Sequence, residues 1–171
     1  MLTVLAYVFE IALFFVVLWL IAFLSTLLHE LGHALGYRLA AGDGRWHIRV
    51  GSGKQLLKTR SLTVKLLPLD GYFLPERAET IDTKKKAVLT LAGGPLLSLL
   101  TLAALVVWKL CKPWEPGVLT SDAAASFFNT ALTVNAVLFF ASVLPFPYVL
   151  GENRGLASDG LQILRILKKE P

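Results

Sequence analysis

Residues 11–36 read IALFFVVLWLIAFLSTLLHELGHALG, an apolar run that leads directly into a motif with two histidines. Residues 11–28 are 18 residues without a charge, which is nearly enough to cross the ~30 Å hydrocarbon layer of a membrane as a helix. His29 and His33 follow four residues apart, so on a helix their rings lie on one face, one turn apart. This stretch therefore predicts a membrane helix that carries a pair of metal-ligating side chains.

The composition of the whole chain agrees with this interpretation. Of the 171 residues, 55% are hydrophobic and 17% are charged, whereas soluble domains carry about 25% charged residues. Two further charge-free runs, 87–108 and 123–151, comprise 22 and 29 residues. These features exclude an ordinary soluble domain. A disulfide framework is excluded as well, because Cys111 is the only cysteine.

The basic residues are distributed unevenly along the chain. Eleven of the 17 Lys and Arg residues lie between Arg38 and Lys86, and four more follow Gly151. By the positive-inside rule, we expect the 38–86 segment and the C-terminus in the cytoplasm and the N-terminus outside. The protein is then a multi-pass protein of the cell membrane, in contact with the lipid bilayer. A nucleic-acid partner is the weaker interpretation, because membrane topology alone explains juxtamembrane basic residues.

The first apolar run differs from a secretory signal peptide. It has no basic segment before it, since Arg38 is the first Lys or Arg of the chain, and it continues into a polar helical motif. A signal peptide instead has a basic start and ends at a small-residue cleavage site. We therefore expect this run to be retained as a membrane helix.

We expect an all-α membrane fold in a single domain, residues 1–171, with about three transmembrane helices. The expected helices cover roughly 2–41, 86–110 and 122–143, followed by a C-terminal amphipathic helix at 159–169. Residues 46–50 and 61–67 are β-leaning runs bounded by Gly and Pro, so we expect a small membrane-associated β-hairpin between the first two helices. Residues 112–117 predict an external turn between the second and third spans.

The sharpest chemical signal is the pattern His29-Glu30-x-x-His33. Two imidazoles at this spacing can hold one zinc ion, and Glu30 can reach a zinc-bound water as the general base. A pair of structural histidines is the alternative, but ionisable groups at membrane depth are costly and usually functional. A catalytic zinc also needs a third protein ligand. Two carboxylates, Asp70 and Asp159, are candidates, and each precedes a Gly that permits close backbone approach.

Four segments, in order along the chain, resemble the site-2 protease family of intramembrane zinc metalloproteases. Residues 25–36 resemble its first catalytic helix, and LPLDGY at 67–72 resembles a β segment that usually ends in Pro-x-Gly-Gly-Tyr. AGGPL at 92–96 resembles the Ala-Gly-Pro-Leu signature of the next core helix. LPFP at 144–147, followed by Ser-Asp-Gly at 158–160, resembles the Asn-x-x-Pro…Asp-Gly region that supplies the third ligand.

The resemblance implies roles for individual residues. By the order of the motifs, Asp159 is the third zinc ligand, and Asp70 belongs with the substrate-binding residues, which are Leu69, Asp70, Gly71, Tyr72 and Asn135. Asn135 is included because Ser142 stands where the family often has Asn. Ser98 similarly stands where Asn often follows Ala-Gly-Pro-Leu. The interval from Pro147 to Asp159 is longer than in the family pattern.

The resemblance also implies an activity. We expect a zinc metalloendopeptidase, with one Zn²⁺ per chain, that hydrolyses peptide bonds within or near transmembrane segments of membrane proteins. Its substrate, a transmembrane protein or peptide, would be held extended on an edge strand near 61–67 or 71–73 by β-augmentation. With no regulatory module evident, we expect control by substrate supply or by a membrane partner.

Two other classes of protein remain as alternatives. One is a catalytically silent zinc-binding membrane scaffold, a pseudo-protease that binds a partner without cutting it. The intact Glu30 argues against this scaffold. The other is a small transporter or channel subunit with a metal-tuned pore, and the three spans lack the paired intramembrane charges expected for it.

Overall fold

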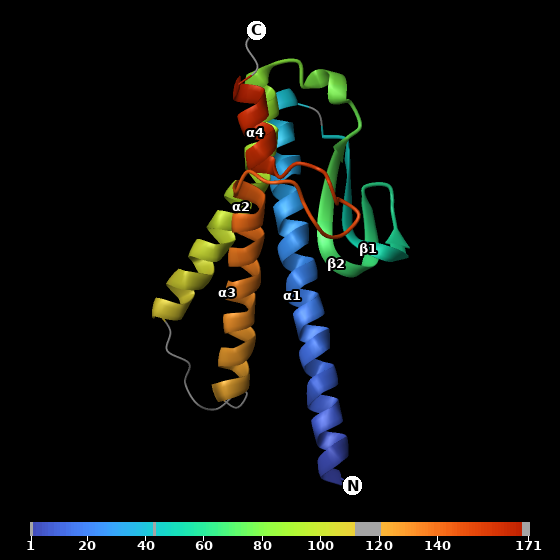
Figure 1. The fold of residues 1–171 in the computed structure, drawn as a ribbon, viewed down its shortest axis with the longest axis vertical. Helices are drawn as coiled ribbons and strands as arrows, with labels where there is room; N and C mark the ends of the chain where they lie inside the picture. The colour runs from blue at the N-terminus through green and yellow to red at the C-terminus, as the bar shows by residue number, and fades with distance from the viewer. Residues whose placement is uncertain (1, 43, 112–120, 169–171) are drawn as a thin grey trace.

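The computed structural model describes residues 2–42, 44–111 and 121–168. The elements are, in chain order, α1 (Leu2–Ala41), β1 (Trp46–Lys58), β2 (Leu62–Pro75), the short 3-10 helix η1 (Ala78–Thr80), α2 (Lys84–Cys111), α3 (Ser121–Val143) and α4 (Asp159–Lys168). The long α1 has α2 and α3 on one side and the two strands on the other, with α4 near its C-terminal end (Figure 1). The turn expected at 112–117 lies outside the described residues.

Among the described residues, three helices are long and apolar enough to cross a membrane. They are Val4–Ala41, Lys84–Cys111 and Ala124–Val143. Many large apolar side chains on the first half of α1 are exposed, and Phe9, for example, is 68% exposed. Apolar exposure on this scale is unfavourable in water, but a surface that faces lipid requires it.

The predicted all-α class is wrong. The strands β1 and β2 have 13 and 14 residues and form an antiparallel sheet, so the chain combines three candidate spans with a sheet. Gly51, Gly53 and Pro68 suggested interruptions, but both strands continue through them. Gly51 and Gly53 have φ values of +90° and +80°, and the pairing register shifts around them. Glycine reaches this left-handed region without strain, so the strands bend at bulges and do not end.

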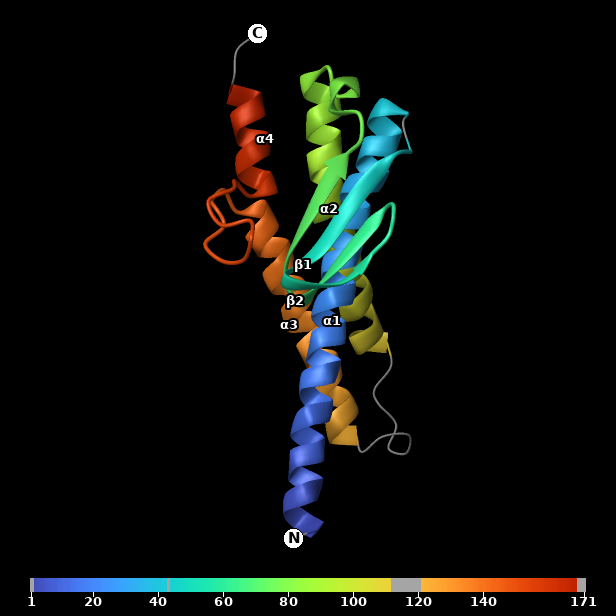
Figure 2. The same ribbon diagram turned by 90° about the vertical axis from the view of Figure 1, so that its right-hand side faces the viewer.

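The two strands pair in three stretches. Residues 46–50 pair with 71–75, residues 48–50 pair with 62–64, and residues 55–58 pair with 63–65. Val50 has both Gly71 and Val64 as partners, so the first part of β1 lies between the two halves of β2 and leaves 71–75 at an edge. The sheet lies against α1 (Figure 2), where Ile48 and Val50 pack with Ala34 of α1 in a small buried core.

Helices α1 and α2 cross at glycines. A Cβ at Gly32 would meet the backbone of Gly93, and a Cβ at Gly93 would meet the carbonyl of Gly32. One turn later, a Cβ at Gly36 would meet the carbonyl of Leu89. Small residues of this kind let membrane helices approach to backbone contact. The Ala-Gly-Gly-Pro segment thus draws α2 against the part of α1 that carries the two histidines.

Candidate metal centre

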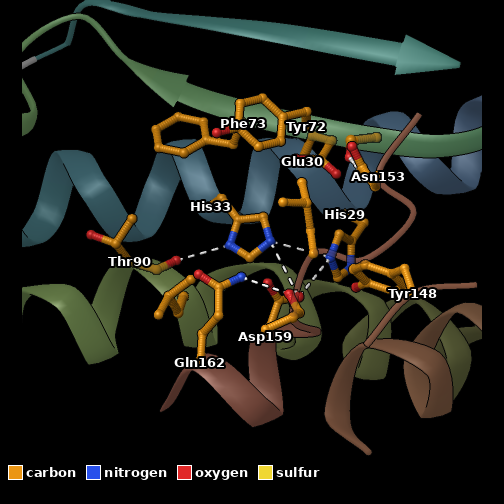
Figure 3. A pocket seen from close by; sticks show the side chains of 14 residues that line it. His29, Glu30, His33, Tyr72, Phe73, Thr90, Tyr148, Asn153, Asp159 and Gln162 are labelled. Atoms are coloured by element: carbon orange, nitrogen blue, oxygen red, sulfur yellow. Dashed lines mark hydrogen bonds and ion pairs between the residues drawn. The ribbon is translucent and has the colours of Figure 1, made fainter. Parts of the chain in front are cut away.

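His29, His33 and Asp159 converge on one point (Figure 3). The Nε2 of His29 lies 3.2 Å from the Nε2 of His33 and 3.2 Å from Oδ2 of Asp159, and the Nε2 of His33 lies 3.5 Å from the same oxygen. In a tetrahedral zinc site with bonds of about 2.0–2.1 Å, neighbouring ligand atoms are ~3.3 Å apart. The three atoms are therefore spaced like three ligands of one tetrahedral ion.

The other ring nitrogens of the two histidines contact α2. The Nδ1 of His33 donates to the carbonyl of Thr90 at 3.0 Å, and the Nδ1 of His29 lies 2.9 Å from the hydroxyl of Ser98. Because a carbonyl only accepts, neutral His33 presents a lone pair on Nε2 to the cluster. When His29 donates to Ser98 in the same way, two lone pairs and a carboxylate face one another, and a cation stabilises that arrangement. Metal-ligating histidines typically have such a second hydrogen bond.

Two glycines make room for the candidate ligands. A Cβ at Gly94 would meet the Nε2 atoms of both histidines, and a Cβ at Gly160 would meet the carbonyl of Val143 at the end of α3. The hydroxyl of Ser158 accepts from the first turn of α4 and donates to the chain just after α3. This N-cap ties the start of α4 to the end of α3 and so positions Asp159.

The charge of Asp159 suits a metal ligand. Burial by itself would raise the pKa of this carboxyl, but hydrogen bonds and charge interactions with His29 and His33 in their protonated forms outweigh it and lower the pKa to about 2. Asp159 is therefore ionised at neutral pH. A carboxylate binds a cation in that state.

Glu30 lies where two cavities meet. A small cavity of about 150 Å³, the more polar of the two, is lined by the three candidate ligands, and an apolar groove of about 440 Å³ is lined by residues of α1, β2, α3 and the segment after α3. Residues common to both are His29, Glu30, Gly71, Tyr148 and Asn153. A Cβ at Gly71 would touch the Glu30 carboxylate. The edge of β2 thus lies directly against the candidate general base.

The structure separates the two carboxylates that local sequence left open. Asp159 lies with the histidines. The Oδ2 of Asp70 instead accepts hydrogen bonds from the backbone N–H groups of Glu152 (2.6 Å) and Asn153 (3.2 Å). Of the two, Asp159 is the carboxylate positioned to share an ion with the imidazoles.

The predicted substrate-binding residues fall into two groups. Leu69 and Asp70 line the apolar groove, Tyr72 lines the polar cavity, and Gly71 lines both. Asn135 instead joins two helices: its Nδ2 donates to the hydroxyl of Ser25 on α1 at 3.0 Å and to a carbonyl of α3. The hairpin residues thus surround the site, whereas Asn135 fastens α3 to α1.

Sequence reasoning missed several residues of the site and noted Ser98 only as a departure from the family pattern. Ser98 and Thr90 lie about two turns apart on one face of α2. This helical spacing is the sequence signal that could have linked both residues to the histidine pair. Tyr148 and Asn153 line both cavities, but local sequence does not indicate where their loop folds. Burial, together with the negative charges of Asp159 and Glu30, raises the pKa of the Tyr148 hydroxyl. This hydroxyl therefore stays protonated beside the cluster.

Comparisons with known proteins add one relative. A Bacillus subtilis (strain 168) protein named "Uncharacterized membrane protein YwmF" is 26% identical over 145 residues, which cover 85% of this chain and 82% of that protein. The chain is a membrane protein. This relative and the three apolar helices confirm the prediction of transmembrane helices in contact with lipid. No family model matches the chain, and no solved structure matches it.

Proposed function

We propose that this protein is a zinc endopeptidase of the site-2 protease kind, which hydrolyses peptide bonds within or near transmembrane segments. The observation that carries the proposal is the convergence of His29, His33 and Asp159 beside Glu30, at the end of an apolar groove. Two imidazoles and one carboxylate are a ligand set of catalytic zinc, which keeps a fourth position open. When bound, zinc would polarise a peptide carbonyl and lower the pKa of water toward ~7.

Each residue of the site then has a separate role. His29, His33 and Asp159 hold the ion, and the contacts from α2 orient the two imidazoles. Glu30 accepts a proton from the attacking water and delivers it to the leaving amine nitrogen as the C–N bond breaks. Because Glu30 is 5% exposed and borders both cavities, it can meet a peptide bond that arrives from the groove.

The groove and the sheet edge favour a transmembrane protein or peptide as the substrate. The groove is lined mainly by apolar side chains of α1, β2 and α3, which suit a lipid-soluble segment. A transmembrane helix hides its carbonyls in its own hydrogen bonds, so the substrate must unwind locally before cleavage. The β2 edge at 71–73 offers backbone groups on which the unwound part can pair.

We further propose that the N-terminus is extracytoplasmic and that the hairpin and the C-terminus are cytoplasmic. The distribution of 15 of the 17 basic residues supports this orientation. In a Cys111→Ser background, a membrane-impermeant maleimide added outside cells should label Glu115→Cys and miss Lys54→Cys. The reverse pattern would overturn the orientation.

Metal removal tests the proposed activity. Purified protein in proteoliposomes should cleave a reporter transmembrane protein, lose this activity with a zinc chelator, and regain it when Zn²⁺ is added back. Cleavage that is insensitive to the chelator would contradict the proposal. Zinc binding without any cleavage by the untreated protein would instead favour the pseudo-protease scaffold.

A further inference from the structure

Residues 147–157, between α3 and α4, form a narrow loop that we call the latch loop. Pro147 and Ala157 pair in an isolated bridge, and the Tyr148 N–H donates to the Leu156 carbonyl at 2.8 Å, so the two arms of the loop lie side by side. In Figure 1 the loop, coloured orange-red, leaves the end of α3 and reaches the sheet. It occupies the interval that is longer here than in the family pattern.

Backbone contacts hold the tip of the latch loop against β2. The Asp70 carboxylate accepts the N–H groups of Glu152 and Asn153, at 2.6 and 3.2 Å. Gly151 has a φ of +73°, and a Cβ there would meet the Asp70 carboxylate. Glycine is therefore required for the tip to come this close.

A partly exposed cluster of charges holds the same tip. The Glu152 carboxylate accepts from Lys65 Nζ at 2.6 and 2.7 Å, from Arg49 Nη1 at 2.8 Å and from the Gly53 N–H at 3.1 Å. The side chain of Glu152 is 35% exposed. Exposed ion pairs contribute little each. These contacts can therefore order the tip in the resting protein and still release it.

The tip occupies the part of the sheet edge that a substrate would use. Asn153 Nδ2 donates to the Gly71 carbonyl at 2.5 Å, and Arg49 Nη2 donates to Asn153 Oδ1 at 2.7 Å. Gly71 in turn lies against Glu30. An extended peptide that pairs with this edge needs the same carbonyl in order to bring its own peptide bond to Glu30. The Asn153 amide thus stands where a backbone N–H of the substrate would stand.

The same loop also borders both cavities. Tyr148 and Asn153 line the apolar groove and the polar cavity alike, and Figure 3 shows both beside His29 and Glu30. A segment in the groove therefore contacts these two side chains as well as His29 and Glu30.

We propose that the latch loop is a built-in gate that covers the substrate-binding edge of β2 at rest and must leave it before a transmembrane segment reaches the metal centre. The inference rests on the proposed function, because it names the regulation of that site. Opening replaces the Asn153 contact with Gly71 by a backbone hydrogen bond of the substrate. It also requires the contacts at Asp70 and Glu152 to break.

A reversible cross-link tests the gate. In a Cys111→Ser background, Asp70→Cys and Glu152→Cys place one thiol on each side of the latch, and a short bis-methanethiosulfonate reagent joins them until a reductant is added. The locked protein should cleave the reporter about tenfold more slowly, or worse, than the same sample after reduction. Glu152→Cys alone, treated with the same reagent, is the matched control. Equal rates before and after reduction would overturn the gate.

Hydrogen exchange tests the gate without any proteolysis. In the Glu30→Gln protein, a synthetic Leu/Ala single-span peptide with a central Gly-Pro break should speed exchange at 147–157 and slow it at 71–75, because the peptide replaces the loop at the edge. Slower exchange in both segments, or no change in either, would overturn the gate. The predicted response, together with a wild-type protein that cleaves no reporter, would count against the protease and retain the gate.

A charge variant provides the second exchange measurement. Without peptide, Glu152→Gln should speed exchange at 147–157 by about two- to fivefold, as expected for the loss of a partly exposed ion pair. Glu79→Gln, on η1, is the matched control and should leave this segment unchanged. Equal effects of the two variants would show that the charge cluster does not hold the loop closed.

Discussion

The His29/His33/Asp159 cluster and the tip of the latch loop are neighbours that are held by different kinds of contact. The cluster side chains are less than a tenth exposed, and α2 supports them through close glycine contacts and two hydrogen bonds to the imidazoles. The tip is held in part by hydrogen bonds to the buried Asp70 carboxylate and in part by long, partly exposed charged side chains, with Glu152 at 35% exposure. Buried, tightly packed groups resist change, whereas exposed ion pairs exchange readily with water. The comparison indicates a rigid cluster of candidate ligands beside a loop that can move away from the sheet edge.

The largest expected effect is on the rate of cleavage. Glu30→Gln removes the general base but no ligand, so cleavage should fall about 10²–10⁴-fold while the zinc content is unchanged. Reporter cleavage and metal analysis on the same preparation check this. Cleavage above about a tenth of the wild-type rate would exclude Glu30 as the base.

The second largest expected effect tests whether the cluster is tightly packed. Gly94→Ala places a methyl group against both imidazoles, and overpacking of this kind costs about 1–3 kcal/mol. Chelator competition should show weaker zinc binding, and thermal unfolding should occur at a lower temperature. Gly44→Ala is the control, because a Cβ there meets no described atom within 4 Å. Unchanged zinc affinity in Gly94→Ala would contradict the observed packing.

A pair of buried serines tests the support of the imidazoles. Ser98 and Ser142 are 2% and 1% exposed, but only the Ser98 hydroxyl contacts His29, while the Ser142 hydroxyl bonds the Phe139 carbonyl of its own helix. Ser98→Ala should weaken zinc retention about 10–100-fold, as loss of an outer partner of a metal ligand does. Ser142→Ala should retain zinc normally. Equal losses would mean that general packing, and not orientation of His29, is responsible.

The smallest expected effect is on hydrogen exchange in the latch loop. The hydrogen bond from Lys65, followed by the Gly53 N–H and the charge of Arg49, lowers the pKa of Glu152 in the folded protein. A lowered pKa means that this contact stabilises the folded state at pH values above the unfolded pKa of about 4.3. The stabilisation is lost as the pH falls through the lower pKa that Glu152 has in the folded protein. Exchange at 147–157, corrected for intrinsic rates, should therefore rise below pH ~4. About 1 M salt should raise it at neutral pH, and insensitivity to both conditions would contradict the charge latch.

The sequence predicted the parts of this molecule that depend on local geometry. The spacing of His29 and His33 determines their relative position, because a helix repeats every ~3.6 residues. The place of Asp159 followed from motif order alone. The all-α class failed because bulges at Gly51 and Gly53 let the strands continue where the β-leaning runs were expected to end. The latch depends on a contact between Asp70 and Glu152 across 82 residues, which no local pattern reports.

Zinc content in two isosteric variants tests the central claim most directly. Asp159→Asn and Asp70→Asn each replace a carboxylate by an amide of equal size, so a difference between them reports on ligation and not on packing. We predict about one zinc per chain in the wild type and in Asp70→Asn, and loss of zinc to a mild chelator in Asp159→Asn. Normal zinc retention by Asp159→Asn, together with zinc loss in Asp70→Asn, would contradict the account and place the metal at the hairpin.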